Sequence, residues 1–238
     1  MDDFQTTHWS LVVAAGQRLS PQSDRALSEL CRKYWLPLYG YVRRRVADVH
    51  EAQDLTQDFF CRVLERNFFA AADPGRGRFR AFLLTSLKHF LANEWEKGRT
   101  QKRGGGLSVI ELDFVVGESR LSLEPGHEET PERLFDRQWA LTLLDLVLAR
   151  LRTEFREAGK LDQFEQLKPF LSGARERSGE NYADVGVATG MTAEAVKVAA
   201  HRLRQRYREL LRAEIAQTVA QPGDVDDEIR ELFQVLGS

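Results

Sequence analysis

Basic side chains recur at helical spacing near the C-terminal end of the chain, in the segment that follows Gly190. Apolar residues of the same segment recur every three or four positions on another face, from Val196 to Leu210. The basic residues are Lys197, His201, Arg204, Arg208 and Arg212. The major groove of DNA admits a helix, and basic side chains on such a helix can reach the phosphates beside the groove. The pattern therefore indicates binding to double-stranded DNA.

A short turn precedes this helix. Gly190 stands where a first helix, beginning near Tyr182, must stop and reverse direction. Thr192 can cap the second helix by accepting a hydrogen bond from a free backbone N–H, and Glu194 lies in its first turn. The charge pattern alone fits an ordinary solvated amphipathic helix equally well, and the capped turn favours DNA binding.

A second group of basic and aromatic residues surrounds a predicted helix that begins near Phe79. Basic segments flank this helix, Asp73 to Arg78 before it and Glu96 to Arg103 after it. The polar residues beside its apolar stripe are Lys88, His89, Asn93 and Lys97. Because bases stack on aromatic faces while cations follow phosphates, the pattern suits single-stranded nucleic acid. A core helix with a polar outer face is the alternative.

No signature of catalysis in the sequence is persuasive. His50 and Glu51 begin a pattern like HExxH, but Asp54 stands where the second His is required. The three glycines at 104–106 lack the Lys-Ser/Thr that follows in a phosphate-binding loop, and a flexible joint explains them better. We therefore expect a protein that is not an enzyme and that has no cofactor and no metal site.

The composition is typical of a soluble globular protein, with 238 residues and a formal net charge of −2. Charge is nevertheless segregated along the chain. The basic segments are Arg76 to Arg103 and Lys197 to Arg212, and the acidic ones are Glu111 to Glu132 and Asp224 to Glu231. Cys31 and Cys61 lack CxxC or metal-ligand spacing, which favours structural thiols in a reducing compartment. Without a long apolar run or a secretory signal pattern, we expect no membrane insertion and a cytoplasmic location.

Helical periodicity dominates the sequence, and sustained alternation of the strand type is hard to find, so the predicted fold class is all-α. We expect two helical domains joined by an acidic linker. The linker is long, so it is either disordered or held extended against a partner, although its apolar patches could pack locally. A solvated helical tail is expected at the acidic end, with folding onto a basic surface as the alternative. The predicted boundaries are 1–103 for the first domain, 104–130 for the linker, 131–220 for the second domain and 221–238 for the tail.

The order of these motifs resembles the sigma subunits of bacterial RNA polymerase, specifically the compact extracytoplasmic-function group. Arg25 to Val46, followed by Asp48 to Arg66, is similar to the paired helices that bind core polymerase. Phe79 to Arg99 is similar to the helix that melts and reads the minus-ten element, and Tyr182 to Leu211 to the module that reads the minus-thirty-five element. The resemblance covers most of the chain. It implies a region 2-like bundle followed by a region 4-like helix-turn-helix domain.

This resemblance also implies roles for individual residues. The core-polymerase-binding residues would be Asp54, Leu55, Gln57, Asp58 and Phe59. The minus-ten strand would be held by Arg78, Arg80, Lys88, His89, Asn93 and Lys97. The residues at or near the minus-thirty-five duplex would be Thr192, Glu194, Lys197, Val198, His201 and Arg202. The implied partners are core RNA polymerase and promoter DNA, with an anti-sigma factor as a further candidate.

Two departures from the family pattern concern DNA binding. Gly186 and Thr189 stand where Ala and Leu are usual, and a glycine costs a helix roughly 1 kcal/mol against alanine, so that helix is expected to be less stable. Val198, Ala199 and Ala200 stand where polar and basic residues are common, which removes phosphate contacts.

The sequence therefore predicts a sigma-type initiation factor that binds core polymerase and opens promoter DNA without covalent chemistry. Two other functions remain open. A stand-alone helix-turn-helix transcription regulator would leave the 54–59 surface without a role. A sigma-like antagonist would occupy polymerase without reading DNA, in keeping with the residues at 198–200.

Overall fold

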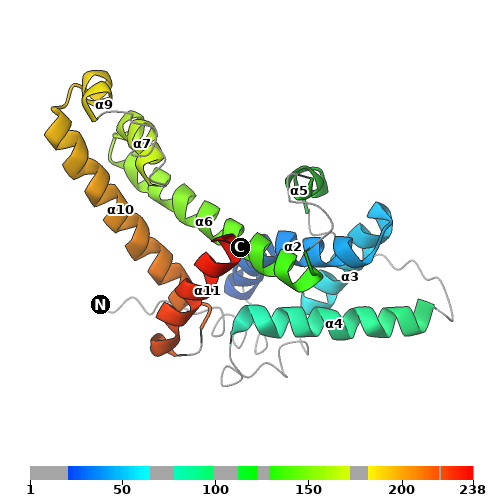
Figure 1. Ribbon diagram of the computed structural model, residues 1–238. Coiled ribbons are helices and arrows are strands. Elements are labelled where there is room, and N and C mark those ends of the chain that lie inside the picture. Colours follow the sequence, from blue (N-terminus) through cyan, green and yellow to red (C-terminus); the bar gives the residue numbers. More distant parts are fainter. Residues whose placement is uncertain are drawn as a thin grey trace. The chain divides into compact units, whose positions relative to one another are not determined.

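The computed structural model describes residues 21–64, 78–98, 112–122, 129–171, 182–219 and 221–237. Regular structure in these ranges is entirely helical, which confirms the all-α prediction (Figure 1). None of the helices in this part of the chain combines the length and apolar character needed to cross a membrane.

By its internal contacts the chain divides into two compact units. Unit 1 comprises residues 1–142 and 215–238, and unit 2 comprises residues 143–214. This division differs from the boundaries expected from the sequence, because it groups residues 131–142 and the predicted tail with the first block. Both boundaries between the units, at 142/143 and at 214/215, fall inside continuous helices, α6 (Pro131–Glu157) and α10 (Ala193–Ala216), and not in loops. A division expected at linkers therefore misses them.

Unit 1 is built on three long helices, α2 (Pro21–Arg45), α3 (Val49–Leu64) and α4 (Phe79–Gly98). Asp48 caps α3, since the backbone N–H of Glu51 donates to its Oδ1 at 2.8 Å. Aromatic rings join the helices: Tyr34 of α2 meets Phe79 of α4 edge-on with ring centroids 5.4 Å apart. Most of the apolar stripe predicted for α4 lies in this core, since Phe79, Leu83, Leu87, Phe90 and Leu91 are buried. Two other members of the stripe are not, because Phe82 is half-buried and Trp95 is exposed.

A short helix, α5 (Phe114–Leu121), forms within the predicted linker. Asp113 caps it, because its side chain accepts a hydrogen bond from Val116 N–H at 3.0 Å. The helix packs on α2 through Gly117, where an added Cβ would lie 3.0 Å from the ring of Trp35. This part of the linker therefore packs locally, while the segments 104–111 and 123–128 lie outside the described residues.

The predicted acidic tail contains a one-turn 3₁₀ segment, η4 (Pro222–Asp224), and a helix, α11 (Val225–Gly237). Val225 and Leu232 of α11 are buried in unit 1. The helix is thus amphipathic and packed on one side rather than solvated all round. Its acidic side chains include Glu228, which is fully buried.

Unit 2 contains the later part of α6, then α7 (Leu161–Leu167), η3 (Lys168–Phe170), α9 (Tyr182–Thr189) and most of α10. Pro169 lies in η3, directly after α7, as expected for a residue that cannot continue a helix. Phe170 stacks on Tyr182 with ring centroids 4.9 Å apart, which fixes the start of α9 on the core of the unit. The segment 172–181, whose polar sequence with two glycines predicts a loop, lies outside the described residues.

Candidate nucleic-acid interface

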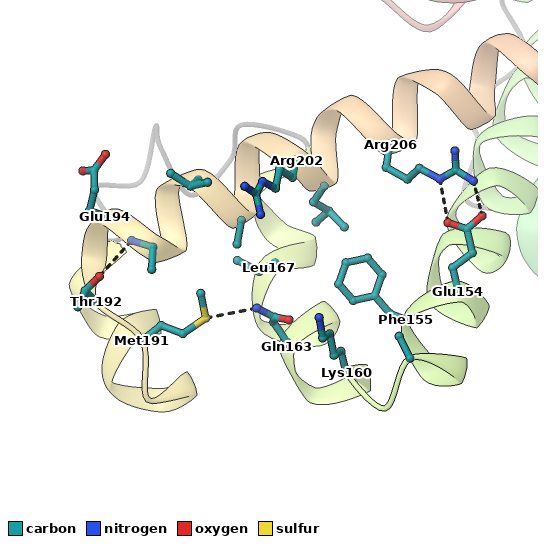
Figure 2. Close-up of a pocket in the computed structure, with 15 residues that line it drawn as sticks. Glu154, Phe155, Lys160, Gln163, Leu167, Met191, Thr192, Glu194, Arg202 and Arg206 are labelled. Carbon is teal, nitrogen blue, oxygen red and sulfur yellow. Dashed lines mark hydrogen bonds and ion pairs between the residues drawn. The ribbon is translucent and has the colours of Figure 1, made fainter.

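The turn between α9 and α10 has the geometry that the sequence predicts. Gly190 adopts a positive φ of 68°, a conformation open to glycine at little cost. Thr192 Oγ1 then accepts a hydrogen bond from Ala195 N–H at 3.2 Å and caps α10 (Figure 2). Two helices therefore follow each other across a tight, capped turn in unit 2.

Gly186 has a different role from the one expected. Its carbonyl accepts a hydrogen bond from Met191 N–H at 2.9 Å, which closes the turn onto α9. A Cβ at this position would lie 2.6 Å from the carbonyl oxygen of Met191, closer than atoms pack. The turn thus requires the absence of a side chain, so this glycine stabilises the turn although glycine is a poor helix former. Sequence propensity alone gave no sign of this close approach.

The six residues predicted to lie at duplex DNA are all exposed in α10 or just before it. They are Thr192, Glu194, Lys197, Val198, His201 and Arg202. The opposite face of the helix is buried, with Val196, Ala200 and Leu203 at 0–1% exposure. The prediction that one face packs while the other is solvent-accessible is therefore confirmed.

A hollow of about 660 Å³ lies beside the first half of α10, and four of these six residues line it (Figure 2). Its walls come from the end of α6, from α7 and from the first half of α10. Phe155, Leu167 and Leu203 give it an apolar lining. Thr192, Glu194, Val198 and Arg202 line it, whereas Lys197 and His201 are not among its lining residues. Lys197 and His201, one turn apart on α10, are therefore the two of the six that lie outside the hollow.

An ion pair lies at one end of this hollow. Both Nε and Nη2 of Arg206 contact the Glu154 carboxylate at 2.9 Å, which joins α10 to α6 (Figure 2). The hydrogen bonds that Arg206 donates to Glu154 and to Glu209 raise the pKa of Arg206 above its ordinary value. At the other end, Gln163 Nε2 lies 3.3 Å from the sulfur of Met191.

The predicted single-strand surface lies along α4, and its residues differ in their surroundings. His89 and Asn93 are exposed. Lys88 is half-buried, and its Nζ lies 2.7 Å from a Glu132 oxygen and 5.8 Å from the ring centroid of Tyr41. The side chain of Lys97 lies outside the described residues, as does the turn at 73–77.

Arg80, predicted on the same surface, is only 7% exposed. Its guanidinium lies 4.6 Å from the ring of Trp139 and forms ion pairs with three carboxylates. The Nε–Glu228 Oε1 distance is 2.7 Å and the Nη2–Glu231 Oε2 distance is 2.9 Å, and Nη1 pairs with Asp136. Burial by itself lowers the pKa of Arg80, but these carboxylates outweigh it and hold the pKa above its ordinary value.

Arg78 shares two of these acidic partners. Its Nε lies 2.7 Å from Glu228 Oε2, and its Nη2 donates to Glu231 Oε1 at 2.6 Å. Its side chain remains 28% exposed. The sequence predicted both arginines on a nucleic-acid surface and did not predict their pairing with Glu228 and Glu231. The only signal of this pairing in the sequence is the acidic run at 224–231. We call Arg78, Arg80, Asp136, Glu228 and Glu231 the arginine-carboxylate cluster.

The predicted polymerase-binding residues lie on α3. Asp54 and Asp58 are exposed, and Leu55 and Gln57 are half-buried. Phe59 is 0% exposed, and its ring packs against that of Phe90 with centroids 5.7 Å apart. The structure therefore places Phe59 beneath the surface, where it fixes α3 on α4.

Asp58 lies among other acidic side chains. Partial burial raises its pKa, and the negative charges of Asp54 and Glu94 raise it further. Two carboxylates on one turn of α3 form an acidic patch that a basic partner group would neutralise.

Among the described residues, no group of three or more His, Cys, Asp or Glu side chains could hold a metal ion. Residues 30–101 match the family model for Sigma-70 region 2. No curated protein and no solved structure matches the chain. The matched segment contains most of α2 and all of α3 and α4, whereas α9 and α10 lie outside it. The match supports a sigma factor role in RNA polymerase binding and promoter melting.

Proposed function

We propose that this chain is a sigma-type initiation factor of the extracytoplasmic-function group. It binds core RNA polymerase and directs it to promoters. The observation that carries the proposal is the Sigma-70 region 2 match over 30–101, which contains both the acidic patch of α3 and the polar face of α4. The chain performs no covalent chemistry, because binding energy is what brings polymerase to the promoter and keeps the strands apart. It acts in the cytoplasm, and an anti-sigma factor is a candidate regulator.

The contact with core polymerase is made by the exposed part of α3. Asp54 and Asp58 lie one turn apart and present carboxylates to solvent, with Gln57 beside them. Basic groups of the polymerase pair with these carboxylates, which favours association and sets the orientation of the helix. Phe59 contributes indirectly by packing α3 against the core of unit 1.

Contacts with promoter DNA come from two helices. On α4, His89 and Asn93 are accessible to an unpaired strand, and the exposed ring of Trp95, at 42% exposure, offers a face for base stacking. On α10, the exposed side chains of Lys197 and His201, one turn apart, approach duplex phosphates. The turn at Gly190 presents the start of α10 to the DNA.

Co-purification with core polymerase tests this proposal. The tagged chain is compared with the combined variant Asp54→Ala, Gln57→Ala and Asp58→Ala. A matched control, Glu157→Ala with Asp162→Ala, removes the same charge from exposed sites of unit 2, outside the matched segment. We expect stoichiometric polymerase with the wild type and the control, and at least a tenfold loss with the α3 variant. Absence of polymerase from the wild-type sample would contradict the proposal.

A sigma-like antagonist is the second candidate, and one observation favours it. Arg78 and Arg80 are already paired with carboxylates of this chain, and Val198 presents an apolar side chain, 43% exposed, on α10. An antagonist would bind polymerase and leave promoter DNA closed. Permanganate footprinting of a promoter, with core polymerase and the chain added together, separates the two functions, since only a sigma factor makes unpaired thymines reactive.

A further inference from the structure

The C-terminal helix α11 covers the start of α4. Glu228 and Glu231, one turn apart on α11, each contact both Arg78 and Arg80. The partners are separated by about 150 residues along the chain, with sequence separations of 148 to 153. Two carboxylates therefore neutralise two guanidinium groups at one end of the predicted single-strand surface.

The N-terminal end of α4 favours the binding of an anion. The first turn of α4 contains no acidic residue, so the positive end of the helix dipole is not neutralised within the helix. The backbone N–H of Phe79 donates to the carbonyl oxygen of Thr218 at 3.1 Å, just before the C-terminal segment turns into α11. The Thr218 carbonyl oxygen and the two carboxylates thus accept hydrogen bonds from the Phe79 N–H and from the two guanidinium groups. A phosphate group can accept hydrogen bonds from the same donors.

We propose that α11 is an internal competitor for the promoter strand: Glu228 and Glu231 occupy the phosphate-binding groups of Arg78 and Arg80, and the strand binds there only when α11 moves away. This inference rests on the proposed function, because it takes the ligand of α4 to be a single-stranded phosphodiester. Its consequence is that the free chain binds DNA weakly and that any event that displaces α11 increases the affinity.

The two carboxylates differ in how firmly they are held. Glu228 is 0% exposed and forms part of the core, whereas the side chain of Glu231 is 42% exposed. Replacing Glu231 therefore weakens the hold of α11 on Arg78 without leaving a cavity. Asp227 provides a matched control, since it is exposed on the same helix and pairs locally with Arg230.

The test measures binding of the free full-length chain to a fluorescent single-stranded oligonucleotide by anisotropy. We expect Glu231→Gln to increase affinity by roughly three- to tenfold, as expected when one charged competitor is removed, and Asp227→Asn to change it by less than about twofold. Adding Arg78→Gln to Glu231→Gln should abolish the gain. An equal gain in both single variants would overturn the inference, because it would show an effect of net charge alone. Absence of any gain, or of any binding by Glu231→Gln, would also overturn it.

Hydrogen exchange gives a second measurement that does not depend on any variant. Saturating oligonucleotide should increase amide exchange in α11 while it protects the start of α4. Protection of both segments together would contradict competition. Failure of the inference is distinguishable from failure of the proposed function, because polymerase co-purification tests only the latter and these DNA measurements contain no polymerase.

Discussion

Arg80 and Glu228 form a buried ion pair, with Nε and Oε1 2.7 Å apart and side-chain exposures of 9% and 0%. They come from α4 and α11 and lie 148 residues apart in the chain. Buried charges are tolerated when each one is paired and hydrogen-bonded. Here Glu228 has both arginines of the cluster as partners, and Arg80 has three carboxylates and the face of Trp139.

Glu228→Gln should destabilise unit 1. The substitution preserves shape but removes one of the negative charges that balance two arginines, and breaking a buried pair costs about 3 kcal/mol or more. Urea unfolding followed by circular dichroism measures the loss. Asp227→Asn, exposed on the same helix, should change the free energy of unfolding by less than about 0.5 kcal/mol. Equal stabilities of the two variants would contradict the buried pair.

Gly186→Ala should destabilise unit 2, against the trend of helix propensity. Alanine gains up to about 1 kcal/mol in a helix. The added Cβ would stand 2.6 Å from Met191 O, and overpacking of this kind typically costs about 1–3 kcal/mol. We expect a net loss on the order of 1 kcal/mol in thermal or urea unfolding. Val187→Ala, at an 88% exposed position of the same helix, is the control and should be neutral or slightly stabilising. A more stable Gly186→Ala protein would refute the close approach.

Cys31 should resist alkylation in the folded chain while Cys61 reacts. Cys31 is 3% exposed, and burial, with a smaller contribution from the charge of Cys61, raises its pKa to about 12. Because the thiolate is the reactive form, iodoacetamide at mildly alkaline pH should modify Cys61 at least about tenfold faster. Mass spectrometry of digested samples gives the ratio, and in urea the two rates should converge. Preferential modification of Cys31 in the folded chain would show that α2 is not packed as described.

Acid should weaken the hold of α11 through Glu231. The hydrogen bond from Arg78 is the largest influence on this carboxylate, and it lowers the pKa of Glu231 below the ordinary value of 4.5. Glu231 therefore contributes stability that is fully present above pH 4.5 and is lost as pH falls through the lower folded-state pKa. The difference in unfolding free energy between wild type and Glu231→Gln should be constant near neutral pH and shrink below pH 4.5.

Other charged groups face Glu231 and shape this acid response. Arg80 lies on α4 and Arg78 directly before it, Glu228 lies on α11 and Asp136 on α6. Burial raises the pKa of Asp136 above its ordinary value. Its protonation in acid therefore removes the unfavourable burial of a charge and increases the free energy of unfolding, whereas protonation of Glu231 decreases it. The comparison with Glu231→Gln isolates Glu231, because Asp136 is common to both proteins. A difference that grows on acidification would contradict the assignment.

Local features of this protein could be predicted from the sequence. The start of α4 at Phe79 and its buried stripe follow from residue periodicity, and the caps at Asp48 and Thr192 follow from side chains that satisfy free N–H groups a few residues away. The turn at Gly190 follows from its tolerance of positive φ. Each of these depends on neighbours within about one helical turn, which the sequence itself specifies.

Tertiary structure alone decided which charges meet. Arg80 looks like a DNA-binding residue in the sequence, and it becomes a buried member of an ion cluster because α11 returns to α4 from 148 residues away. Phe59 belongs to a predicted contact surface, and it is buried because α3 turns that face toward Phe90. Gly186 reads as a weak point of its helix, and it is required because the carbonyl of Met191 approaches it. Periodicity and propensity carry no information about such encounters, since they depend on how helices pack rather than on the residues that form them.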